Sequence, residues 1–137
     1  MVHTPSNIKS PLWVANEAEK IAAENGLEIR VLAGKELTEF GGLRAVGNSS
    51  PKPGPRFVEI TYHPKGMKKN SGALPHVVIV GKGITFDTGG LALKPAAGME
   101  AMKSDMSGAA AVSAAVVAIA ELKLNVAIDA WAPLAEN

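Results

Sequence analysis

The sequence has no cysteine among its 137 residues, and aromatic side chains make up only 4% of it. The absence of cysteine excludes disulfide bonds and thiolate chemistry, and it fits a reducing compartment. Charge is nearly balanced at a formal +1, so composition gives no electrostatic case for binding nucleic acid or a membrane surface. The longest apolar run, within residues 109–120, is much shorter than the ~20 residues that a membrane-spanning helix needs. No signal-peptide pattern opens the chain. We therefore expect a cytoplasmic protein without membrane contact.

Helix and strand signals alternate along the chain and indicate an α/β fold. Ser10-Pro11 is typical of a helix start, with serine as the N-cap and proline at the first helical position, and Asn25-Gly26 marks the expected end. The core-facing residues of this helix are expected at helical spacing: Leu12, Ala15, Ala18, Ile21 and Ala22. The other expected elements are strands at 27–32, 56–62, 77–80 and 125–133, a short helix at 35–40 closed by Gly41-Gly42, a solvated loop at 63–75 and a helix at 107–122. This order predicts a three-layer α/β sandwich with a mixed, mostly parallel sheet that is incomplete.

Residues 77–106 are the segment around which the other elements are arranged. An apolar strand, Val77–Val80, stops at Gly81 and is followed by a long connection rich in glycine. The strand and the helix after the connection are apolar on nearly all sides, so we expect the strand to be central and both elements to be buried. In α/β domains ligands sit beyond the carboxyl ends of strands, which makes this connection the expected site.

Known nucleotide and nucleophile motifs fail at this connection. Phe86 stands where the dinucleotide fingerprint needs its third glycine, and Gly83 follows Lys82 where a P-loop needs serine or threonine. No G-x-S-x-G nucleophile elbow occurs. The three histidines are too dispersed for a zinc-binding helix motif. Nucleotide binding therefore has no specific support.

Acidic residues single out the same connection. Two of the three aspartates in the chain, Asp87 and Asp105, lie in it. Carboxylates bind hard divalent cations, and one carboxylate can bridge two metal ions. Lys82 is either an ion-pair partner or a neutral amine, since burial beside cations disfavours the charged form of lysine. Lys94 is either an electrophile for a carbonyl or a solvated loop residue, and spacing alone leaves both alternatives open.

These residues, in their context, resemble the leucyl (cytosol) aminopeptidase family. The similarity rests on VGKGITFDTGG at 80–90, on Lys94 and on MKSDM at 102–106, and it extends from TPSN at 4–7 to APLAEN at 132–137. The resemblance implies two divalent metal ions, which could be zinc, manganese or magnesium. By the resemblance, Lys82 is a neutral amine ligand, Asp87 bridges the two ions, and Asp105 binds beside Lys82 near the amino group of the substrate.

The resemblance also implies a reaction, the hydrolysis of amino-terminal, leucine-type residues from peptides by a homohexameric enzyme. Lys94 would polarise the scissile carbonyl, and Met102 would line the pocket for the first side chain of the substrate. The implied chemistry is metal-assisted hydrolysis, in which the positive charge of Lys94 helps to stabilise the developing oxyanion.

The sequence departs from the family in two respects. The family motif Asn-Thr-Asp-Ala-Glu-Gly-Arg, which supplies further metal ligands and a catalytic arginine, does not occur in these 137 residues, nor does the separate amino-terminal domain. We therefore expect residues 1–137 to be part of a catalytic domain, cut at both ends and inactive alone. The alternative is a catalytically inactive α/β module with weak metal binding or none.

Overall fold

The computed structural model describes residues 1–50, 53–64 and 74–137. The predicted loop at 63–75 therefore lies largely outside the described residues. In chain order the elements are α1 (Pro11–Glu24), β1 (Glu28–Ala33), the 3-10 helix η1 (Gly34–Leu37), α2 (Gly41–Gly47), β2 (Arg56–Tyr62), β3 (His76–Val80), β4 (Gly83–Ile84), α3 (Ala96–Met99), the 3-10 helix η2 (Glu100–Ser104), α4 (Ser107–Glu121) and β5 (Ala127–Ala135).

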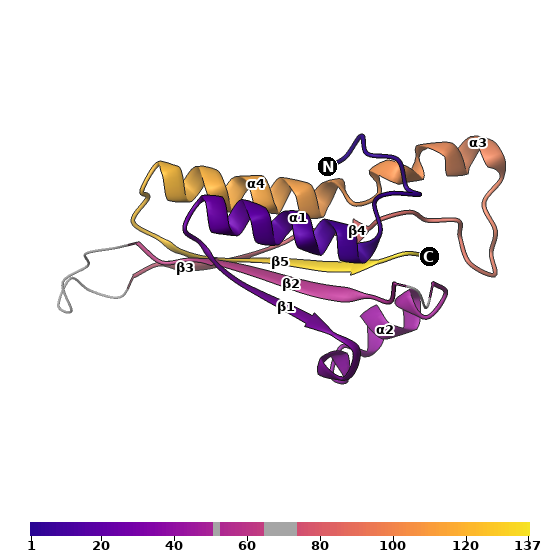
Figure 1. Ribbon diagram of the computed structural model, residues 1–137, viewed down its shortest axis with the longest axis horizontal. Coiled ribbons are helices and arrows are strands. Elements are labelled where there is room, and N and C mark those ends of the chain that lie inside the picture. Colours follow the sequence, from indigo (N-terminus) through magenta and orange to yellow (C-terminus); the bar gives the residue numbers. More distant parts are fainter. Residues whose placement is uncertain (51–52, 65–73) are drawn as a thin grey trace.

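The strands form one mixed sheet in the order β1-β2-β5-β3, with the short β4 also paired to β5 (Figure 1). β1 and β5 both run antiparallel to β2, whereas β3 and β4 run parallel to β5. Helices α1 and α4 lie side by side on one face, and η1 and α2 pack on the other face at one end. The predicted mixed α/β sheet is confirmed, although its pairings are divided evenly between parallel and antiparallel.

Helix α1 begins and ends where the sequence predicts. The Trp13 N–H donates to Ser10 Oγ at 3.2 Å, and after the helix Gly26 takes a left-handed φ of 63°. The buried face is a stripe of mostly small residues: Pro11, Val14, Ala15, Ala18 and Ala22. Leu12, expected in the core, is 41% exposed because it lies about 100° around the helix from Pro11.

The predicted helix at 35–40, closed by Gly41-Gly42, is wrong. A 3-10 helix covers 34–37, and the two glycines begin α2 instead of ending a helix. Glycine is a poor helix former, so the sequence favoured a stop. Leu43 packs against the cluster of Leu32, Leu37 and Phe57 on the second face of the sheet, and this contact stabilises the helix.

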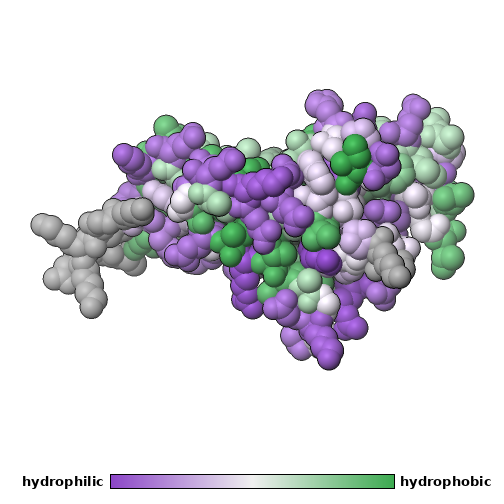
Figure 2. Space-filling view, viewed as in Figure 1, coloured by the Kyte–Doolittle hydropathy of each residue, from purple (hydrophilic) through white to green (hydrophobic). Residues whose placement is uncertain are grey.

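The predicted burial of the strand at 77–80 and of the helix at 107–122 is also wrong. In the part of the sheet that the structure describes, β3 is an edge strand, and Val77, Val78 and Val80 are 44%, 44% and 63% exposed. Helix α4 has the expected position but buries only Ala109, Ser113 and Val116. Figure 2 shows further apolar surface at the end of the molecule that carries the β4–α3 connection. An apolar pattern shows that a strand or helix needs other protein atoms to shield it from water, and the described residues shield these two elements only in part.

One helical stretch among the described residues, Ala96–Glu121, is long and apolar enough to cross a membrane. Length and composition alone are a weak indication, because the core helix of a soluble protein passes the same test. The α4 part of this stretch packs on β5, β2 and β3.

Candidate metal and active site

A close crossing of two backbone segments creates the site. Gly81 follows β3, and Gly108 lies in the first turn of α4. A Cβ atom at Gly81 would lie 2.2 Å from the Gly108 carbonyl oxygen, and one at Gly108 would lie 2.7 Å from the Lys82 nitrogen. The Ala109 N–H also donates to the Lys82 carbonyl at 2.9 Å. Glycine at both positions therefore lets the strand end touch the helix start, and this contact places Lys82 beside the turn that carries Asp105.

The first ion pair joins Lys82 and Asp105. Nζ of Lys82 lies 2.8 Å from Oδ2 of Asp105, and the two side chains are 61% and 18% exposed. Although the two atoms are close, their angles do not make a hydrogen bond, and Oδ2 is buried without any hydrogen-bond partner in the described structure. A buried carboxylate oxygen that accepts no hydrogen bond can bind a cation, which here is the Lys82 ammonium or a metal ion in its place.

The second ion pair joins Lys94 and Asp87, with 3.1 Å between Nζ and Oδ2. The other oxygen of Asp87, Oδ1, accepts the Gly89 N–H at 2.9 Å and the Asn137 side-chain amide at 2.8 Å. Burial raises the pKa of Asp87, but the Gly89 N–H, the Lys94 ammonium and the Asn137 amide together lower it below its usual value. Asp87 is therefore held as a carboxylate in a fixed orientation.

Glycine turns and the end of β5 position this second pair. Gly89 and Gly90 have left-handed φ angles of 95° and 62°, and the Lys94 N–H donates back to the Thr88 carbonyl at 2.8 Å. The Thr88 N–H in turn donates to the Asn137 carbonyl at 2.6 Å. Asn137 was missed as a site residue by the sequence analysis. No local signal identifies it, because its role depends on β4 and β5 lying side by side.

Met102 lies in η2, half-buried, and its carbonyl accepts the Asp105 N–H at 3.1 Å. A hollow of about 400 Å³ beside Lys82 is lined instead by apolar residues of other elements: Leu43, Val46, Val80, Ile84 and Pro133. A larger hollow of about 690 Å³ lies at the opposite end of the sheet, next to Thr61 and His63. This second hollow is therefore remote from both ion pairs, and we assign the site from the charged residues.

The predicted site residues thus form two ion pairs, Lys82 with Asp105 and Lys94 with Asp87. No group of three or more His, Cys, Asp or Glu side chains that could hold a metal ion occurs within the described ranges. Lys82 and Asp105 fit one side of a metal site, because Asp105 Oδ2 accepts no hydrogen bond in the described structure and the Lys82 amine lies next to it. Asp87 offers Oδ2 if Lys94 turns away. The described residues alone supply too few ligands for two complete coordination shells.

Comparisons with known proteins identify the family of this chain. The sequence model of the cytosol aminopeptidase family, catalytic domain, matches residues 1–137. A probable cytosol aminopeptidase of Streptomyces avermitilis is 47% identical over 139 residues, which cover 100% of this chain and 26% of that protein. The bottromycin maturation enzyme BotP in complex with Mn is 43% identical with a TM-score of 0.86, and the match covers 99% of this chain and 28% of BotP. The apo leucyl aminopeptidase from Trypanosoma cruzi is 37% identical with a TM-score of 0.88, and the match covers 99% of this chain and 26% of that protein.

The chain spans about a quarter of the length of these relatives. The family model nevertheless matches residues 1–137, the whole of this chain. This chain belongs to the cytosol aminopeptidase family.

Proposed function

We propose that residues 1–137 form part of the active site of a metal-dependent aminopeptidase that removes amino-terminal, leucine-type residues from peptides. The observation that carries this proposal is the pairing of Lys82 with Asp105 and of Lys94 with Asp87, in the connection that follows β3. In the proposed enzyme the remaining metal ligands belong to a longer protein, in which the family's acidic motif completes the site.

Two divalent ions would bind here, and Lys82, Asp105 and Asp87 are the residues of this chain that would hold them. Zinc, manganese and magnesium all remain candidates, since a mixed nitrogen and oxygen ligand set does not choose among them. When bound, the ions supply Lewis-acid activation of the peptide carbonyl and of water. Lys82 must lose its proton before its amine can bind a metal, so metal binding should release protons.

The side chains of this chain would orient the substrate. The carboxylate of Asp105 would accept a hydrogen bond from the positively charged amino terminus of the peptide. The ammonium of Lys94 would turn from Asp87 towards the scissile carbonyl, where it would stabilise negative charge as it develops. Removing one such donor typically lowers kcat by roughly 10²- to 10³-fold. Met102 would contact the first side chain of the peptide from η2.

Assembly and compartment belong to the same proposal. We expect a cytoplasmic homohexamer, as the resemblance to the family implies, and size-exclusion chromatography with light scattering on the full-length protein would measure the assembly directly. A monomer at micromolar concentration would contradict this part without affecting the assignment of the site.

The proposal is tested by hydrolysis of leucine p-nitroanilide by the full-length protein, with manganese or zinc added. Asp87→Ala should abolish turnover, and Lys94→Ala should lower kcat by at least about a hundredfold. Lys20→Ala is a matched control, because Lys20 is a mostly exposed lysine on α1. Turnover by Asp87→Ala at the level of the control would contradict the proposed function.

A further inference from the structure

We propose that Lys9 is a positioning residue that holds the turn carrying Met102 and Asp105 in its working geometry. The inference rests on the proposed function, since it concerns the same site. It starts from an unusual observation: a lysine in the segment before α1 is completely buried.

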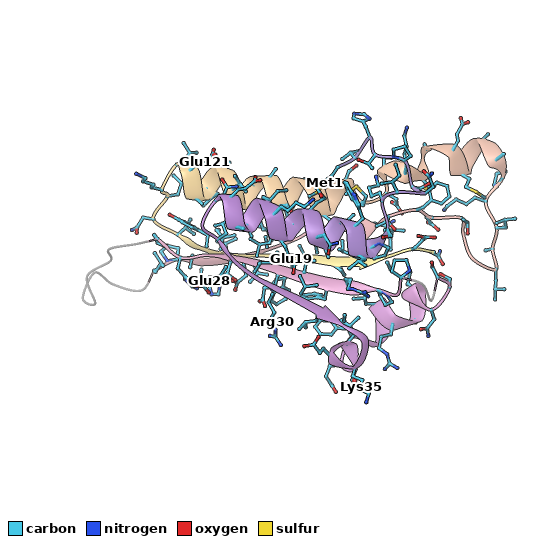
Figure 3. The ribbon with its side chains drawn as sticks, viewed as in Figure 1. Met1, Glu19, Glu28, Arg30, Lys35 and Glu121 are labelled. Atoms are coloured by element: carbon cyan, nitrogen blue, oxygen red, sulfur yellow. The ribbon has the colours of Figure 1, made fainter. Side chains whose placement is uncertain are left out.

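The ammonium of Lys9 uses its three protons on main-chain carbonyl oxygens. Nζ donates to the carbonyls of Met1 at 3.5 Å, Val2 at 2.9 Å and Lys103 at 2.6 Å. Met1 lies beside α4, as Figure 3 shows. Lys9 therefore ties three segments together: the start of the chain, the entry to α1 and the last turn of η2.

The bond to Lys103 matters for the site because of where Lys103 lies. It follows Met102 directly and precedes Asp105 by two residues. On the other side of Asp105, Met106 is fully buried in the main core. The backbone that carries Asp105 is thus fixed on one side by a charged hydrogen bond and on the other by core packing. Lys82 therefore forms its ion pair with a carboxylate whose backbone is already held in place.

Burying a lysine ammonium costs free energy unless its hydrogen bonds compensate for the lost water. Desolvation lowers the pKa of Lys9, and the positive charge of Lys103 lowers it further. An aliphatic side chain in the same volume would avoid this penalty but could not donate to the Lys103 carbonyl. A carbonyl in the last turn of a helix has no donor within that helix, so a donor from outside is valuable there. The geometry therefore favours a positioning role over simple filling of space.

The test compares Lys9→Met, which keeps the length and removes the donors, with Lys9→Gln, which keeps an amide donor. Lys20→Met serves as the control on α1. In the full-length protein we would measure hydrogen–deuterium exchange of amides 100–107, the Kd for Mn²⁺, and kcat and KM for leucine p-nitroanilide. A charged hydrogen bond of this kind corresponds to roughly a ten- to hundredfold effect. Lys9→Met should show faster exchange, weaker Mn²⁺ binding and lower kcat/KM within that range, and Lys9→Gln should recover part of each.

A purely structural role would lower Tm in both Lys9 variants while exchange of 100–107, the Kd and kcat/KM stayed within about twofold of the control; that result would overturn the inference. If neither variant folds, the unsubstituted protein still decides, because fast exchange of amides 103–107 relative to the middle of α4 would show that the turn is not held. If the unsubstituted protein binds Mn²⁺ but cleaves no leucine substrate, the proposed function fails, while the exchange and Mn²⁺ measurements still judge the role of Lys9.

Discussion

Replacing Gly81 with alanine should separate the two halves of the site. The added Cβ atom would lie 2.2 Å from the Gly108 carbonyl oxygen and 2.7 Å from the Ala109 nitrogen, both of which are backbone atoms that cannot rotate away. The strand end must therefore move from the first turn of α4. This movement would break the 2.9 Å hydrogen bond from Ala109 to Lys82 and draw Lys82 away from Asp105.

The expected loss can be estimated from these contacts. Overpacking in a tight interior typically costs about 1–3 kcal/mol, and the lost hydrogen bond adds about 0.5–1.5 kcal/mol. We therefore expect the free energy of unfolding to fall by about 1.5–4.5 kcal/mol in total, measured by urea denaturation followed by circular dichroism. The Kd for Mn²⁺ should rise in parallel, because Lys82 and Asp105, the two ligands that we propose, would no longer lie close together.

Gly42→Ala is the matched control. A Cβ at Gly42, in α2, has no neighbour within 4 Å, and this glycine does not have a left-handed φ. Alanine is the better helix former by about 0.5–1 kcal/mol, so this variant should be unchanged or slightly more stable. If Gly81→Ala is as stable as Gly42→Ala and binds Mn²⁺ equally well, the close crossing does not position the site as we describe.

Three further predictions concern the acidic residues and the extent of the chain. Asn137→Ala should raise the pKa of Asp87 in metal-free protein by removing one of its hydrogen-bond donors, which an NMR titration of the carboxyl carbon would detect; an unchanged pKa would contradict the contact. Because the folded pKa of Asp87 lies below the ordinary value of 3.8, its stabilising contribution is complete above that value and is lost as the pH falls through the folded pKa. Between about pH 4 and pH 2, the urea midpoint of Asp87→Asn should therefore fall less than that of the unsubstituted protein. An equal fall in the two proteins would contradict this prediction. Residues 1–137 alone should hydrolyse leucine amide negligibly even with zinc or manganese, because too few ligands are present, and robust Asp87-dependent turnover would show that this reasoning is wrong.

Local signals in the sequence predicted most of the elements. Ser10 and Pro11 mark the start of α1 because a cap and a fixed φ act within one turn, and the alternation of 56–62 places β2 without error. The charged residues of the β4–α4 connection were found for a different reason. They lie close together in sequence, within a context specific enough to match a known family.

Features that depend on distant parts of the chain could not be predicted. Lys9 and Lys103 are 94 positions apart, and Asp87 and Asn137 are 50 apart, so no window of sequence shows either contact. The prediction that β3 is buried failed for the same reason. The sequence shows an apolar strand, but its neighbours are decided by sheet order, and among the described strands only β5 pairs with it. Pairing between residues distant in sequence is the information that a local pattern lacks.

We propose that Lys82, Asp87 and Asp105 hold the catalytic metal ions. Anomalous diffraction at the manganese edge, from crystals of the full-length protein soaked in Mn²⁺, tests it directly. We expect one peak roughly 2.0–2.3 Å from Lys82 Nζ and from an Asp105 oxygen, and a second peak within bonding distance of Asp87. Manganese bound elsewhere in an active enzyme, with Lys82 and Asp105 still ion-paired to each other, would contradict it.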